Sequence, residues 1–103
     1  MSTWDVGLEI SERVLRKLRD KHNVSRDEIV QCFANRLGGS LKDTREKNRT
    51  DPPTLWFVAE TDMGRLLKIV YIRADTGVFH IKTAYAANEV EIAIYKRVAA
   101  VCF

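Results

Sequence analysis

Residues 54–85 read TLWFVAETDMGRLLKIVYIRADTGVFHIKTAY, and this stretch decides the fold. Three largely apolar runs, 54–60, 65–73 and 78–85, are separated by two four-residue connectors that end in Gly64 and Gly77. Short connectors of this kind are typical of β-hairpins, so the sequence predicts a three-stranded antiparallel meander. The middle run is apolar at nearly every position, which favours the centre of the sheet.

Two helices are predicted before the meander. Ser11 is a suitable N-cap for an amphipathic helix over 11–22. Ser25 and Glu28 have the spacing of a capping box, which predicts that a second helix begins there and covers 25–37. The glycine pair that follows residue 37 stops this helix.

The remaining segments complete the predicted fold. Residues 1–10 alternate in polarity and suggest a short extended lead-in, and the polar segment 40–53 is predicted as a loop that starts with a short edge strand. Asn88 is the N-cap of a closing helix. The apolar stripe expected on this helix is Val90, Ile94 and Val98. We therefore expect one α+β domain over 1–103, with a three- to four-stranded antiparallel sheet.

Composition and charge limit the classes of function. The chain has 103 residues and a net charge of +3, and the excess lies in residues 1–50, which hold 11 Lys/Arg and 8 Asp/Glu. A basic half fits a nucleic acid or an acidic protein as partner. No run is long and apolar enough for a membrane helix, and residues 1–10 do not have the pattern of a signal peptide. Cys32 and Cys102 fit no metal or redox motif, and the sequence predicts a cytoplasmic protein.

The standard catalytic and cofactor signatures are missing from the sequence. It contains no GxxxxGK[ST], GxGxxG, GxSxG or HExxH motif, and its two histidines form no Cys/His cluster with zinc spacing. The sequence therefore predicts neither a cofactor nor a metal site.

Basic and polar residues on the meander supply the candidate chemistry. His80 and Lys82 are two apart in the third run, so they project from one strand face, and Tyr85 follows on the other face unless the strand bends. Arg65 begins the middle run, and Glu46 lies in the polar loop. A metal-independent ribonuclease needs a base, a cation for the phosphorane and an acid, and these residue types supply them. A solvated sheet face carries the same types, so that alternative stays open.

Five further basic residues are candidates for contacts with an RNA backbone. Three lie on the first helix and two lie in the polar loop: Arg13, Lys17, Lys21, Arg45 and Arg49.

Four segments resemble the BrnT-like toxins of bacterial type II toxin–antitoxin systems and the related RelE/ParE-like small domains. The segments are LRDKHNVSRDEIVQCF, the loop from Asp43 to Arg49, TLWFVAETDMGRLLKIVYI and VFHIKTAYAANEVEIAIYKR. The segments follow the order that the family shows, and the resemblance covers about residues 11–97 of the chain.

The resemblance implies a ribonuclease that cuts mRNA and is held inactive by a cognate antitoxin. By position, Lys21 and His22 match the Lys-His pair of the family, and Arg65 matches the arginine of its central hairpin. Glu46 and Arg49 match the acidic and basic loop residues, whereas Lys82 and Tyr85 match the last strand.

The last strand also differs from the family pattern. Where the family has Arg-Ile-Ile-Ser-Ala-Arg, this chain has arginine at neither end, with His80 first and Tyr85 last. A tyrosine cannot supply the permanent cation of an arginine. This difference keeps an alternative open, a non-catalytic domain of the same fold that binds an acidic protein or a nucleic acid. The hydrophobic residues 99–103 also leave self-association open.

Overall fold

The computed structural model describes residues 7–45 and 50–103 and has the predicted α+β class. The described chain folds around a five-stranded mixed sheet in the order β1-β5-β4-β3-β2. Its main strands are β3 (Thr54–Glu60), β4 (Leu66–Arg73) and β5 (Phe79–Ala86), which form the predicted antiparallel meander with β4 at the centre. Gly64 and Gly77 have φ of 84° and 90° in the two connecting turns, a conformation that favours glycine.

Two short strands extend the sheet beyond the predicted meander. β2 (Leu41–Lys42) pairs antiparallel with β3, as expected for an edge strand. β1 (Leu8–Glu9) pairs parallel with β5, so the prediction of a wholly antiparallel sheet of three or four strands is wrong. The predicted lead-in thus becomes a strand because β5 offers it an unpaired edge.

The N-terminal helices begin at their predicted caps. α2 (Glu12–Lys17) continues directly into the π-helical turn η1 (Leu18–His22), and the Ser11 side chain accepts a hydrogen bond from the Val14 amide at 3.2 Å. α3 (Arg26–Asn35) begins with the complete capping box of Ser25. It ends two residues earlier than predicted because Arg36 has an extended ψ of 129°.

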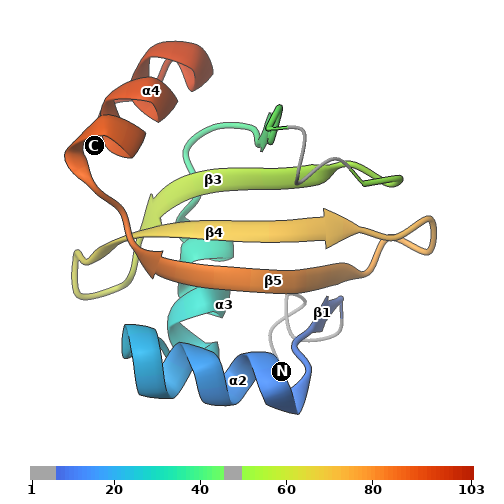
Figure 1. Cartoon of the computed structure of the whole chain (residues 1–103). Helices are drawn as coiled ribbons and strands as arrows, with labels where there is room; N and C mark the ends of the chain where they lie inside the picture. Colours follow the sequence, from blue (N-terminus) through green and yellow to red (C-terminus); the bar gives the residue numbers. More distant parts are fainter. Residues whose placement is uncertain (1–6, 46–49) are drawn as a thin grey trace.

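The sheet is covered unequally on its two faces (Figure 1). α3 lies behind the strands in this view, and Phe33 on it packs against the rings of Phe57, Tyr71 and Phe79 in the core. On the opposite face, which we call the open face, α4 (Glu89–Ala99) lies near one end of the sheet.

The rotation of α4 differs from the sequence prediction. The expected apolar stripe is largely exposed, at 67% for Val90, 36% for Ile94 and 57% for Val98. Tyr95 is fully buried instead, and it shares a helix face with Glu91, four residues earlier. Glu91 binds the sheet through Lys68, so this polar anchor and Tyr95 turn the valine stripe outward.

A β-bulge in β5 changes the predicted alternation of this strand. Ile81 lies opposite Tyr71 and Thr83 lies opposite Val70, which leaves Lys82 as an extra residue. Ile81 and Ala84 are therefore both buried, although they are three positions apart. The regular alternation that would place Tyr85 on the face opposite Lys82 does not hold, because the bulge re-aims Tyr85 toward the open face.

None of the helices in the described part of the chain is long and apolar enough to cross a membrane.

Candidate nucleic-acid interface

A hollow of about 360 Å³ lies on the open face beside α2, and we call it the sheet hollow. Lys17 of α2, Arg45 of the loop after β2, and Lys82 and Tyr85 of β5 all line it. The bulge makes this arrangement, because regular alternation would send Lys82 and Tyr85 to opposite faces. Four of the residues proposed from the sequence are thus brought together.

A second hollow of about 570 Å³ lies at the β1 edge of the sheet, and we call it the edge hollow. Arg13, His80 and Lys82 line it, so Lys82 is shared with the sheet hollow. His80 Nδ1 lies 3.5 Å from a carboxylate oxygen of Glu9 on the neighbouring strand. Together the two hollows form one continuous surface.

We call this surface the basic strip. It is defined by five exposed side chains: Arg13, Lys17, Arg45, His80 and Lys82. Three separate segments of the chain contribute to it, namely α2, the loop after β2, and β5.

The carboxylate of Glu91 joins α4 to the open face of the sheet. Its Oε2 accepts a hydrogen bond from Lys68 Nζ at 2.9 Å and another from the Tyr85 hydroxyl at 2.8 Å. Its Oε1 accepts from the amide of Asn88 at 3.1 Å, which completes the N-terminal capping box of α4. One side chain therefore caps a helix, pairs with a buried ammonium and fixes the hydroxyl of Tyr85.

The electrostatics of this cluster follow from burial and hydrogen bonding. Burial raises the pKa of Glu91, but hydrogen bonds from Lys68, the Asn88 amide and Tyr85 outweigh it, so the pKa is lower than usual. Burial, followed by the hydrogen bond to Glu91, raises the pKa of Tyr85. At neutral pH the cluster therefore holds a carboxylate and a neutral phenol.

Aromatic rings surround the Lys68 ammonium. Lys68 Nζ lies 4.5 Å from the ring centroid of Trp56 and 5.8 Å from that of Tyr85, within the range of cation–π attraction. The His22 ring packs against Tyr85 at a centroid distance of 5.7 Å. His22 thus contacts the rim of the site through its ring.

Arg65 lies apart from the basic strip. Its guanidinium donates hydrogen bonds to the carbonyls of Asn23 at 2.7 Å and His22 at 3.1 Å, and it pairs with Glu28 at 3.1 Å. These bonds satisfy carbonyls at the C-terminal end of η1. Arg65 precedes β4 and His80 pairs with Ile72 near its far end, which separates them by roughly 20 Å.

Three other predicted residues do not join the strip. Lys21 is exposed on η1 and lines neither hollow. Glu46 and Arg49 lie outside the described residues.

The strip is suited to bind phosphate groups. Its cations come from separate elements and surround two hollows, which is how a phosphate backbone is held. His80 and Tyr85 are five residues apart on β5, about 15 Å, so they cannot act on the same phosphate. Within residues 7–45 and 50–103, no group of His, Cys, Asp and Glu side chains could hold a metal ion.

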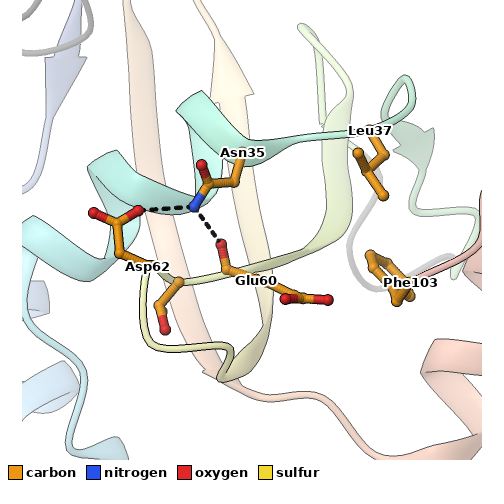
Figure 2. Close-up of a pocket in the computed structure, with 6 residues that line it drawn as sticks. Asn35, Leu37, Glu60, Asp62 and Phe103 are labelled. Atoms are coloured by element: carbon orange, nitrogen blue, oxygen red, sulfur yellow. Dashed lines mark hydrogen bonds between the residues drawn. The ribbon is translucent and has the colours of Figure 1, made fainter.

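A third hollow, of about 470 Å³, has the opposite charge (Figure 2). It lies at the Glu60 end of β3, where Asn35 Nδ2 donates to the Glu60 carbonyl at 3.0 Å and to the Asp62 carboxylate at 2.9 Å. Leu37 and Phe103 face each other across its apolar side. Its two carboxylates would repel a phosphate, so it does not extend the basic strip.

The sequence interpretation did not place Lys68, Glu91 or Trp56 in the site. Lys68 had a detectable signal, since it is the only charged residue inside the otherwise apolar core of its strand. Glu91 had another, because Asn88 and Glu91 have capping-box spacing. That these residues meet depends on how α4 packs, which no local pattern specifies.

No protein-family model matches this chain, and a search of curated proteins gives no significant match.

Proposed function

We propose that this protein binds single-stranded RNA along the basic strip and cleaves it without a metal ion, as a toxin-like ribonuclease in the cytoplasm. One observation carries the proposal: Arg13, Lys17, Arg45 and Lys82 converge from three segments on two hollows joined at Lys82. A row of cations along a connected surface fits a polyanion better than it fits a single small ligand. The resemblance of four segments to BrnT-like toxins points the same way.

The edge hollow is the cleavage site in this proposal. His80 takes the proton of a ribose 2′-hydroxyl, whose oxygen attacks the adjacent phosphorus while the 5′-oxygen leaves with a proton from solvent. Lys82, two residues along β5, stabilises the extra negative charge of the phosphorane. Arg13 and Lys17 hold the neighbouring phosphates. Arg65 is assigned no catalytic role, because its guanidinium binds backbone carbonyls of η1.

A cognate antitoxin or another acidic protein is the proposed partner. Carboxylates on such a protein would pair with the same cations that hold phosphate, and its binding would exclude RNA.

A second function, binding without cleavage, is favoured by the pairing of the carboxylates beside Tyr85. Asp43 accepts hydrogen bonds from Arg45, and Glu91 accepts hydrogen bonds from Lys68 and Tyr85. Neither carboxylate is placed to act as a general base in the sheet hollow, so this part of the strip binds phosphate only. The two functions then differ solely in whether His80 performs chemistry.

Cleavage of RNA by the purified protein distinguishes the two functions. We expect His80→Ala to lower the cleavage rate about 10²- to 10⁴-fold while RNA affinity changes little, as for loss of a general base. Lys82→Ala should lower both quantities. The matched control is Lys96→Ala/Arg97→Ala, which removes two exposed cations from α4 outside the strip.

Growth of a bacterial culture after induction provides a second readout. Arrest by the wild type, and growth with an equally folded His80→Ala/Lys82→Ala variant, is the expected result. RNA binding without cleavage by the wild type would contradict the ribonuclease and leave the binding function.

A further inference from the structure

A larger hollow of about 530 Å³ lies beside the sheet hollow, between α4 and the β2–β3 edge of the sheet. We call it the apolar hollow. Its apolar lining comes from Leu41 of β2, Trp56 of β3, and Ile94 and Val98 of α4. The valine and isoleucine are members of the helix stripe that the rotation of α4 turns away from the sheet.

The apolar hollow is continuous with the sheet hollow. Asp43 and Arg45 line both, so the cation that faces one also reaches the other. Lys68 marks the boundary, with its ammonium 4.5 Å from the ring centroid of Trp56 on one side and 5.8 Å from that of Tyr85 on the other. Asp43 and Arg45 therefore join the sheet hollow to the apolar hollow.

The sheet hollow and the apolar hollow match the two parts of a nucleotide, its phosphate and its base. A phosphate needs cations, which Lys17 and Lys82 supply in the sheet hollow, where Arg45 is paired with Asp43. A base needs an aromatic or apolar platform together with a few polar groups, which Trp56, Lys68 and Asp43 supply in the apolar hollow. Both volumes lie within the usual range for small-molecule sites, about 300–1,000 Å³.

We propose that the apolar hollow is a base-binding subsite, which holds an unstacked RNA base against Trp56 while the phosphate of the same nucleotide lies in the sheet hollow. The inference rests on the proposed RNA binding and names its substrate class, single-stranded RNA with a base turned out of the stack. Duplex RNA is excluded from this mode, because its bases are stacked and paired.

Trp56 is the base-stacking residue in this assignment. The Lys68 ammonium over its ring, with Glu91 beyond, fixes the ring position before any ligand arrives. The ring of Tyr95 packs against Trp56 at a centroid distance of 6.0 Å and adds further support. A platform held in place in this way loses little conformational entropy when a base stacks on it.

Mononucleotides test the subsite separately from RNA binding. In a Trp4→Phe background, Trp56 is the only tryptophan, and its indole N–H gives a single NMR signal. The probes are adenosine monophosphate, uridine monophosphate, ribose 5-phosphate and inorganic phosphate. We expect the nucleotides to bind about 5- to 150-fold more tightly than ribose 5-phosphate, the contribution of one stacked base. They should shift the Trp56 signal, whereas phosphate should shift only signals of the sheet hollow.

The Trp56→Leu variant should bind all four probes with the same affinity. If it fails to fold, the wild-type NMR titration still decides the matter. Equal affinities of nucleotides and ribose 5-phosphate, with an unchanged Trp56 signal, would overturn the base subsite and leave the basic strip intact. An acidic amphipathic peptide that shifts the Trp56 signal when nucleotides do not would assign the apolar hollow to a protein partner instead.

Failure of the proposed function has a different signature. In that case RNA affinity would not respond to Lys17→Ala/Lys82→Ala, whatever the mononucleotides do.

Discussion

Glu91 connects α4, β4 and β5 through one carboxylate, so its removal should be costly to stability. The side chains of Glu91 and Lys68 are only 15% and 9% exposed. Removal of one partner from a buried ion pair costs about 3–5 kcal/mol, because the other charge stays buried and unpaired. The remaining exposure places this pair near the lower end, so we expect Glu91→Ala to lower the free energy of unfolding by about 3 kcal/mol.

A double-mutant cycle separates this pairing from the helix cap. Lys68→Met/Glu91→Leu replaces both charges with apolar groups, which is often neutral for a buried pair, so only the lost cap remains, at about 1 kcal/mol. The single variants of the cycle are Glu91→Leu, at about 3 kcal/mol, and Lys68→Met, so the coupling energy between Lys68 and Glu91 should be at least about 2 kcal/mol, the difference between about 3 and about 1 kcal/mol. Urea unfolding at neutral pH gives the free energy of unfolding of the wild type, the two single variants and the double variant. The matched control is Glu89→Ala, which removes an exposed carboxylate from the same helical turn.

Two results would refute this reasoning. One is a Glu91→Ala variant that is no less stable than Glu89→Ala, which should lose only about 0.3–1 kcal/mol. The other is a coupling energy below about 0.5 kcal/mol, the usual limit for independent sites.

Three further predictions concern pH, Arg65 and the cysteines. Because the pKa of Glu91 is lowered in the folded protein, its carboxylate stabilises the fold above the ordinary glutamate pKa, and this stabilisation is lost as the pH falls through the pKa of the folded protein. Glu91→Gln should therefore flatten the acid side of the curve of unfolding free energy against pH. Arg65→Ala should cost about 1–3 kcal/mol in urea unfolding and leave RNA affinity unchanged at a temperature where it is folded, since its carbonyl partners lose their donors. Burial raises the pKa of Cys32 to about 12, whereas Cys102 is exposed. After alkylation at mildly alkaline pH, mass spectrometry should therefore find only Cys102 labelled in the folded protein and both cysteines labelled in urea. Labelling of Cys32 in the folded protein would contradict its burial.

Local sequence signals predicted most of the secondary structure. The three main strands lie within one residue of their expected bounds, because the turns that contain Gly64 and Gly77 separate β3 from β4 and β4 from β5. The caps at Ser11, Ser25 and Asn88 were predicted and are confirmed by their hydrogen bonds. Such signals act over three or four residues, so the sequence alone reveals them.

The features that the sequence did not reveal depend on contacts between distant segments. The parallel pairing of β1 with β5 joins residues about seventy positions apart. The bulge at Lys82 and the rotation of α4 depend on how the strands and the helix pack. The valine stripe of α4 has the period of a buried face, but the bond from Lys68 to Glu91 selects a different face.

The same distinction between local signals and contacts of distant segments applies to the candidate site. Residue type and position were enough to propose Lys17, Arg45, Lys82 and Tyr85, which line the sheet hollow. The same reasoning placed Arg65 with them, because chain position does not show that its guanidinium reaches back to the carbonyls of η1.

The salt dependence of RNA binding tests the central claim most directly. Fluorescence anisotropy with a labelled single-stranded RNA, between about 50 and 200 mM salt, should show that Lys17→Ala/Lys82→Ala lowers the slope of log affinity against log salt by about 1.4, two phosphate contacts on a single strand. Lys96→Ala/Arg97→Ala, which removes the same charge from α4, should leave the slope unchanged. Equal slopes for the wild type and both variants would contradict the assignment of the basic strip as the RNA-binding surface.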